Sequence, residues 1–121
     1  MELHTASYGA WRPGMGFPVV ASLVVPKWLP EAQQWPRCWV VTPQWSYWRA
    51  GWPEPFSERY VAQLERHGPQ KIARVLHQIA REHQAEELTL LCFERDWHEC
   101  HRGLLACWLL ERTGELVTEL M

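Results

Sequence analysis

The stretch from Leu88 to Arg112, LTLLCFERDWHECHRGLLACWLLER, constrains the fold more than any other part of this sequence. An apolar segment (Leu88 to Phe93) is followed by a charged loop (Glu94 to Glu99) and then by an amphipathic segment (Cys100 to Arg112), which predicts a strand-loop-helix unit. In open α/β proteins, ligands usually bind where a strand's carboxyl end meets a helix's amino end. The stretch therefore predicts a site as well as a fold, and its candidate side chains are Cys92, Glu94, Cys100, His101 and Arg102.

The segments on either side of this unit predict an α/β fold. Leu3 to Tyr8 alternates loosely as a first strand, and Val19 to Val25, bounded by prolines, is typical of a buried strand. Two helices follow, one capped by Ser57 and the next with Pro69 in its first turn. The tail Glu115 to Met121 predicts an edge strand. Because a strand-helix-strand order favours parallel pairing, we expect a small, mostly parallel sheet flanked by about three helices.

The segment Pro26 to Pro55 interrupts this pattern and is predicted to be irregular. Its prolines exclude long helices and leave room only for short elements such as Cys38 to Val41. Seven of the nine tryptophans lie between Trp11 and Trp52, and this aromatic content argues against disorder. Most of these rings are expected in or over the core. A chain of 121 residues without a linker is expected to form a single domain over residues 1–121.

Charge and apolar runs narrow the classes of function. Twelve basic residues stand against fourteen acidic ones, and the net charge of −2 argues against a broad electrostatic grip on duplex nucleic acid, although a local patch stays open. The longest apolar runs are too short to cross a bilayer, and the amino terminus has no signal-peptide pattern. We therefore expect a cytoplasmic protein without a membrane partner.

The four cysteines are expected to be reduced. Cys100 and Cys107 lie seven positions apart on the predicted helix, which places them about 10 Å apart along its axis and beyond the reach of a disulfide. In the expected cytoplasmic compartment thiols stay reduced.

The motif CFE at positions 92–94, followed after five residues by CHR at positions 100–102, closely resembles the signature of the bacterial and phage family known as domain of unknown function 488. Three upstream segments resemble that family more weakly: VVASLVVPKW, TPQWSYW, and FSERYVAQLE with Tyr60. The resemblance covers roughly Leu3 to Leu120 and implies an α/β fold with a site of unestablished chemistry. The segment Pro26 to Pro55 departs from the family in composition, so no ligand contact is carried over to it.

The start of the predicted helix suits an anion. Its free backbone N–H groups carry a partial positive charge, and Arg102 in the first turn adds a cation with bidentate geometry. Phosphate, a nucleotide or a nucleic-acid end is the natural ligand. The structural alternative is that Arg102 pairs with Glu94 or Asp96 and only fixes the loop.

The same strand-to-helix junction also suits a reacting thiol or imidazole group. A helix amino terminus with His and Arg nearby favours the thiolate form of Cys100, which then acts as a nucleophile. Cys92 is placed like the nucleophile of phosphatase loops, but these need an arginine six positions later, where this chain has His98. His101 is the other candidate, as a general acid or base oriented by Glu94. The structural alternative is that both cysteines are small buried residues that pack the junction.

Metal binding is a further alternative. Cys92, Cys100, His101 and His98 offer donors that suit zinc. Neighbouring residues on a helix point about 100° apart, however, so Cys100 and His101 would chelate jointly only if the helix starts later. The paired CxxC spacing of zinc sites is also missing. We therefore assign neither a metal nor a cofactor.

The tryptophans bear on the choice of partner. Trp39, Trp45, Trp48 or Trp52, beside Arg49, would hold a nucleobase by stacking. The alternative is a non-enzymatic module in which an exposed tryptophan surface binds a protein partner and the cluster at the junction is purely structural.

The leading hypothesis is a domain that binds a phosphate-bearing ligand, either a nucleotide or a nucleic-acid end. Whether it is also an enzyme stays open. This hypothesis places Arg102, Cys92, Arg49 and Tyr60 in contact with the ligand. Any chemistry is assigned to Cys100, His101 and Glu94.

Overall fold

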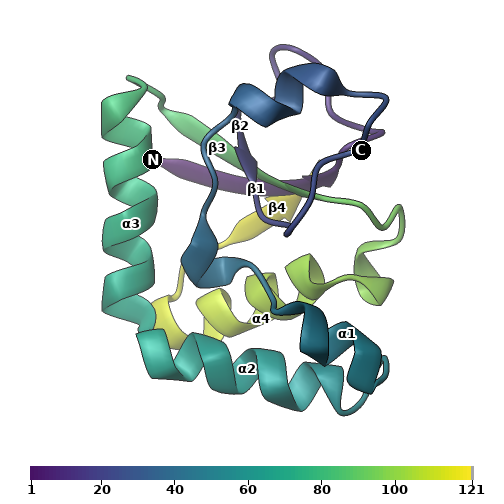
Figure 1. Ribbon diagram of the computed structural model, residues 1–121. Coiled ribbons are helices and arrows are strands. Elements are labelled where there is room, and N and C mark those ends of the chain that lie inside the picture. The colour runs from purple at the N-terminus through teal and green to yellow at the C-terminus, as the bar shows by residue number, and fades with distance from the viewer. Residues whose placement is uncertain (121) are drawn as a thin grey trace.

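A four-stranded sheet in which every pairing is parallel forms the centre of the computed structural model, which describes residues 1–120 apart from the side chain of Trp97. The strands are β1 (Glu2–Ser7), β2 (Phe17–Val20), β3 (Glu87–Cys92) and β4 (Val117–Glu119). Their order in the sheet is β2-β3-β1-β4, so β3 is paired on both sides and β4 lies at the edge beside β1. The predicted mostly parallel α/β sheet is confirmed (Figure 1).

Four α-helices accompany the sheet in the described residues, one more than the sequence predicts. Helices α2 (Phe56–His67), α3 (Pro69–Glu82) and α4 (His101–Thr113) correspond to the three expected ones. The addition is α1 (Trp45–Ala50), a helix of six residues inside the proline-rich segment. Helices α1, α2 and α4 lie on one side of the sheet, and α3 stands beside it (Figure 1). No helix among residues 1–120 combines the length and apolar character needed to cross a membrane.

Alternating residues divide the core between the two faces of the sheet. Leu88 and Leu90 of β3 pack with the helices in the larger cluster, whereas Leu91 faces the opposite side. A 3₁₀ turn, Pro30–Gln34, lies over that opposite side and buries Ala32 against Val20. Strands β2 and β3 are largely apolar in sequence because both faces of a parallel sheet are covered.

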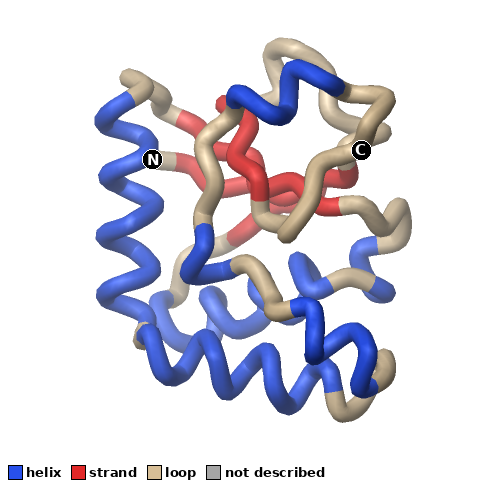
Figure 2. The backbone as a smooth tube through the Cα atoms, in the orientation of Figure 1, coloured by secondary structure: helices blue, strands red, loops and turns tan. Residues whose placement is uncertain are grey.

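The proline-rich segment links the two sides of the sheet. Figure 2 shows it running from the 3₁₀ turn on one side to α1 on the other. Several of its aromatic rings pack over the core, as predicted. The ring centroids of Trp35 and Trp11 lie 4.9 Å apart in an edge-on arrangement, and those of Trp48 and Phe56 lie 4.0 Å apart. Three rings are nevertheless largely exposed, namely Trp28 at 64%, Trp39 at 58% and Trp45 at 59%.

Two strand boundaries differ from those predicted. The predicted strand Val19 to Val25 is instead Phe17–Val20, because after Val20 the chain leaves the sheet and the hydroxyl of Ser22 bonds the main-chain carbonyl of Val24. Pro18 lies within this strand, which is tolerated because β2 is an edge strand. The predicted tail strand is shorter, Val117–Glu119, and Met121 at the end of its predicted range lies outside the described residues.

One predicted helix cap is wrong. Helix α2 begins at Phe56 with Pro55 at the cap position, and the Ser57 hydroxyl donates to the carbonyl of Pro53 instead of capping the helix. The predicted start of α3 at Pro69 is confirmed.

Candidate functional site

A pocket of about 420 Å³ opens at the carboxyl end of β3. It lies where a parallel α/β sheet usually binds ligands, beside the strand ends and the first turn of the following helix. Its volume falls in the range of about 300–1,000 Å³ that small-molecule sites occupy. Most of its wall is apolar, and its polar groups converge from the loop after β2, from β3 and the loop after it, and from α4. The lining residues are Ser22, Leu23, Val24, Pro43, Trp45, Trp48, Cys92, Phe93, Glu94, Cys100 and His101.

The start of α4 decides how the cysteines and the histidine are arranged. Cys100 has an extended backbone (φ −135°, ψ 151°) and is the cap residue, so the helix begins only at His101. The angular argument against joint use of Cys100 and His101 holds for two residues inside a helix and does not apply here. The Sγ atoms of Cys92 and Cys100 and a ring nitrogen of His101 all lie within 4.8 Å of one another, and the three residues are buried.

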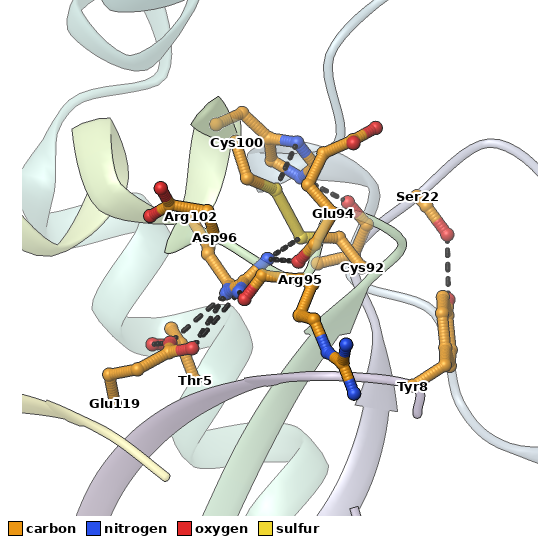
Figure 3. Close-up of a disulfide and its surroundings, with 12 residues drawn as sticks. Thr5, Tyr8, Ser22, Cys92, Glu94, Arg95, Asp96, Cys100, Arg102 and Glu119 are labelled. Carbon is orange, nitrogen blue, oxygen red and sulfur yellow. Dashed lines mark hydrogen bonds and ion pairs between the residues drawn. A yellow bond between two sulfur atoms is a disulfide. The ribbon is translucent and has the colours of Figure 1, made fainter. Parts of the chain in front are cut away.

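The expectation of four reduced cysteines is wrong for one pair. Cys92 and Cys100 are joined as a disulfide, whereas Cys38 and Cys107 are free (Figure 3). The sequence argument considered only spacing along the helix. The strand end and the helix start converge in space, which brings together two sulfurs that are eight positions apart in the sequence.

His101 is held in one tautomer by the backbone. Its Nε2 lies 2.6 Å from the carbonyl oxygen of Ala21, and a carbonyl only accepts, so Nε2 carries the proton. The lone pair of Nδ1 therefore faces Cys100, whose Sγ is 3.6 Å away. The rings of Tyr60 and Trp48 pack edge-on against the imidazole at 5.5 and 6.2 Å. Ala21, not Glu94 as predicted, orients the ring.

The imidazole of His101 is neutral at physiological pH. Burial lowers its pKa to about 4; the hydrogen bond to Ala21 opposes this shift, and the charge of Arg102 adds to it. A neutral ring with a protonated Nε2 leaves Nδ1 as an acceptor or a metal ligand.

Arg102 is only 1% exposed, and all five of its N–H groups have acceptors within the chain. Its Nε and one terminal nitrogen donate to the carboxylate of Glu119 at 3.0 Å each. The other donors reach the carbonyl oxygens of Glu94 (2.5 Å) and Arg95 (3.1 Å) and the Sγ of Cys92 (3.1 Å) (Figure 3). The guanidinium therefore fixes the loop through its backbone and lies beside the sulfur pair.

Glu119 is the site residue that sequence reasoning missed. The predicted partner of Arg102 was Glu94 or Asp96, but the carboxylate that pairs with it comes from β4, seventeen positions later. Glu119 also accepts a hydrogen bond from the Thr5 hydroxyl at 2.7 Å. An acidic residue in the weakly alternating tail was the available signal, yet only the pairing of β4 with β1 places it under α4.

The remaining predicted residues lie at different distances from the pocket. Glu94 is exposed and lines it. Asp96 accepts from the backbone N–H of His98, and this hydrogen bond is the largest of the causes that lower its pKa. Tyr60 is buried and donates to the carbonyl of Val41, so it supports the site only through its ring contact with His101. Arg49 is exposed on α1 and is not among the residues that line the pocket.

Fold and site together define a parallel α/β domain with a cysteine-histidine pocket at the carboxyl edge of its sheet. The family described as Domain of unknown function DUF488 matches residues 34–109, so the chain belongs to that family, in line with the resemblance of its motifs. The match includes both halves of the cysteine motif, whereas Thr5 and Glu119 lie outside the matched range. No curated protein and no solved structure matches the chain.

Proposed function

We propose that this protein binds a small phosphate-bearing ligand, a nucleotide being the best fit, in the pocket beside α4. The observation that carries the proposal is the convergence of Cys92, Cys100 and His101 in the lining of a pocket whose other walls are largely apolar. Convergent polar groups in an apolar pocket are the usual form of a small-molecule site.

The two parts of a nucleotide suit different walls. Trp45 and Trp48 line the pocket and offer flat faces on which a base stacks, an interaction of about 1–3 kcal/mol per base. The first turn of α4 offers backbone N–H groups and the positive end of its dipole to a phosphate, since Cys100 makes no side-chain cap. The carboxylate of Glu94 disfavours an anion on its own side of the pocket, so the phosphate belongs on the α4 side.

The proposal changes the role of Arg102. Its guanidinium is buried and engaged by Glu119, so it positions the loop and the Cys92 sulfur instead of contacting the ligand. Cys100 in its thiol form is the proposed nucleophile. In the reduced protein without a bound metal, its proton passes to Nδ1 of His101 as its sulfur forms a bond to an electrophilic atom of the ligand, and the leaving group departs with its electron pair and that proton.

A matched pair of tryptophans tests the ligand proposal. Trp45 and Trp28 are about equally exposed, but only Trp45 lines the pocket. Nucleoside mono- and diphosphates are added to the purified protein, and the melting temperature is measured. We expect a rise in the wild type and in Trp28→Ala and its loss in Trp45→Ala, because a ligand of the folded state stabilises by mass action. No rise with any nucleotide, or a rise that survives Trp45→Ala, refutes the proposal.

Cys107, on the same helix, is the control for testing Cys100 as the nucleophile. In the reduced protein, a bound nucleotide is expected to slow alkylation of Cys100 and to leave that of exposed Cys107 unchanged, as read by mass spectrometry of peptides. Equal protection of both cysteines, or of neither, removes the support for Cys100 as the reacting group.

A second candidate is a protein-interaction module. It is favoured by Trp28 and Trp39, which are 64% and 58% exposed and lie away from the pocket lining. Exposed aromatic residues are enriched at protein-protein interfaces. The protein-interaction module is supported if no nucleotide binds and acrylamide quenches the fluorescence of Trp28 and Trp39. It loses its support if Trp28→Ala with Trp39→Ala leaves the quenching unchanged.

A further inference from the structure

The donor atoms in the pocket have the chemistry of a metal site. Two cysteine sulfurs and one imidazole nitrogen lie within 4.8 Å of one another. Around a zinc ion, Zn–S bonds of about 2.3 Å and Zn–N bonds of about 2.0 Å place such donors roughly 3–4 Å apart. Small side-chain movements therefore suffice to bring all three donors onto one ion.

The imidazole is oriented as in metal-bound histidines. A metal-binding histidine usually donates its other ring N–H to a carboxylate or a backbone carbonyl, which fixes the tautomer. Nε2 of His101 makes this bond with Ala21 at 2.6 Å, and Nδ1 faces Cys100. The edge-on rings of Tyr60 and Trp48 hold the plane of the imidazole.

The sulfur atoms also have the surroundings of metal ligands. The Nη1 atom of Arg102 donates a hydrogen bond to Cys92 Sγ, with 3.1 Å between nitrogen and sulfur. An outer-shell hydrogen bond of this kind stabilises a metal-bound thiolate. The α-carbons of Cys92 and Cys100 lie 7.7 Å apart, wider than the roughly 4.4–6.8 Å that disulfides span. A common ion between the two sulfurs suits this wider backbone spacing, because two metal–sulfur bonds then take the place of the single S–S bond.

We infer that Cys92, Cys100 and His101 bind one zinc ion in the reduced protein, through both Sγ atoms and Nδ1, with the fourth coordination position facing the pocket. Thiolate and imidazole donors select zinc over magnesium or calcium, which take oxygen ligands. Three protein ligands and one open position are the arrangement of catalytic zinc sites. The inference rests on the proposed function for its ligand. The ion supplies the positive charge that Arg102, paired with Glu119, does not offer a phosphate oxygen.

The disulfide between Cys92 and Cys100 has to be reduced before zinc can bind. A disulfide between Cys92 and Cys100 takes up two electrons from a phosphine reductant, which becomes a phosphine oxide with the oxygen of one water molecule, and the two protons of that water complete the thiols. Zinc binding then releases both thiol protons to the solvent. When zinc binds the lone pair of His101 Nδ1, that nitrogen can no longer accept a proton. His101 therefore cannot bind zinc and act as a general base at the same time.

Cobalt titration tests the inference. The protein is reduced with tris(carboxyethyl)phosphine, freed of metal with EDTA, exchanged into buffer without chelator and titrated with Co²⁺. We expect a thiolate-to-cobalt charge-transfer band and intense visible bands of a four-coordinate ion that saturate at about one Co²⁺ per chain and disappear on addition of Zn²⁺. Wild-type protein with four free thiols that gives no charge-transfer band overturns the inference.

Variants identify the ligands. The cobalt spectrum is expected to be lost or strongly weakened in Cys92→Ser and Cys100→Ser and kept in Cys107→Ser, whose cysteine lies on α4 away from the pocket lining. His101→Asn is expected to shift the visible bands, because one nitrogen donor is lost. Equal loss in Cys107→Ser, or an unchanged spectrum in Cys92→Ser, refutes the assignment. If a variant does not fold, zinc protection of Cys92 and Cys100 from alkylation in the wild type decides, and its absence refutes the site.

The zinc site and the phosphate-bearing ligand can each be refuted without the other. Nucleotide-dependent melting shifts are compared in metal-free and zinc-loaded protein. A nucleotide shift without any cobalt band leaves the proposed function standing and overturns the zinc site. A cobalt band without any nucleotide shift supports the zinc site and overturns the phosphate-bearing ligand. A shift that grows when zinc is added supports both.

Discussion

The ion pair between Arg102 and Glu119 is the contact whose removal has the most predictable consequence. Arg102 is 1% exposed, and the side chain of Glu119 is 17% exposed. The pair joins α4 to β4, and the same guanidinium fixes the loop after β3 through two carbonyl oxygens. Arg102→Ala leaves the carboxylate of Glu119 without its cation in a largely buried place.

The magnitude follows from burial. Breaking a buried ion pair by removing one partner costs about 3–5 kcal/mol. The carbonyls of Glu94 and Arg95 belong to exposed residues and recover hydrogen bonds from water, so they add little. A chain of 121 residues has a free energy of unfolding of roughly 6–18 kcal/mol. We therefore expect Arg102→Ala to remove about 3–5 kcal/mol and to lower the melting temperature by roughly 10–20 °C.

The assay is a double-mutant cycle in urea, with unfolding followed by circular dichroism. Arg102→Ala and Glu119→Ala are measured singly and together. Because the double variant retains neither charge, it is expected to be more stable than the sum of the single changes implies, by about 2–3 kcal/mol. Arg74→Ala on the exposed side of α3 is the control and should change stability by less than about 0.5 kcal/mol. A loss below about 1 kcal/mol in Arg102→Ala, or an additive cycle, contradicts this reasoning.

Two further predictions concern thiols and glycines. Burial raises the pKa of Cys38 to about 12, so its thiol stays protonated and a thiol reagent at pH 8 should label exposed Cys107 while leaving Cys38 unlabelled until urea is added. Labelling of both at equal rates in the folded protein contradicts this. Gly16 and Gly14 both have positive φ, but an added Cβ at Gly16 meets the Thr89 hydroxyl, whereas one at Gly14 meets nothing within 4 Å. Gly16→Ala should therefore destabilise by about 1–3 kcal/mol more than Gly14→Ala in urea unfolding, and equal effects exclude the steric cause.

Local patterns in the sequence were sufficient for the elements that lie close together along the chain. The apolar run before Cys92, Pro69 in the first turn of α3, and the glycines that end α2 and α4 (Gly68 and Gly114) predict the strand and helices that the structure has. These signals are local because backbone hydrogen bonding and capping act over a few residues. They also predicted the junction at which Cys92, Cys100 and His101 come together in the structure. The strand at Val19 to Val25 was misplaced because apolar residues continue past Val20 into a loop, where Val25 is buried by tertiary contacts although it is not in the sheet.

The sequence by itself determined the family, the α/β class and the stretch that holds the cysteines and His101. Only the tertiary structure decided how these residues are used. It paired Arg102 with Glu119 from a distant strand, bonded the two sulfurs across a loop, and turned His101 toward the carbonyl of Ala21, the residue after β2. The physical reason is that a buried charge, thiol or imidazole takes its partner from whatever the packed elements bring within about 3 Å, and sequence spacing does not encode that proximity.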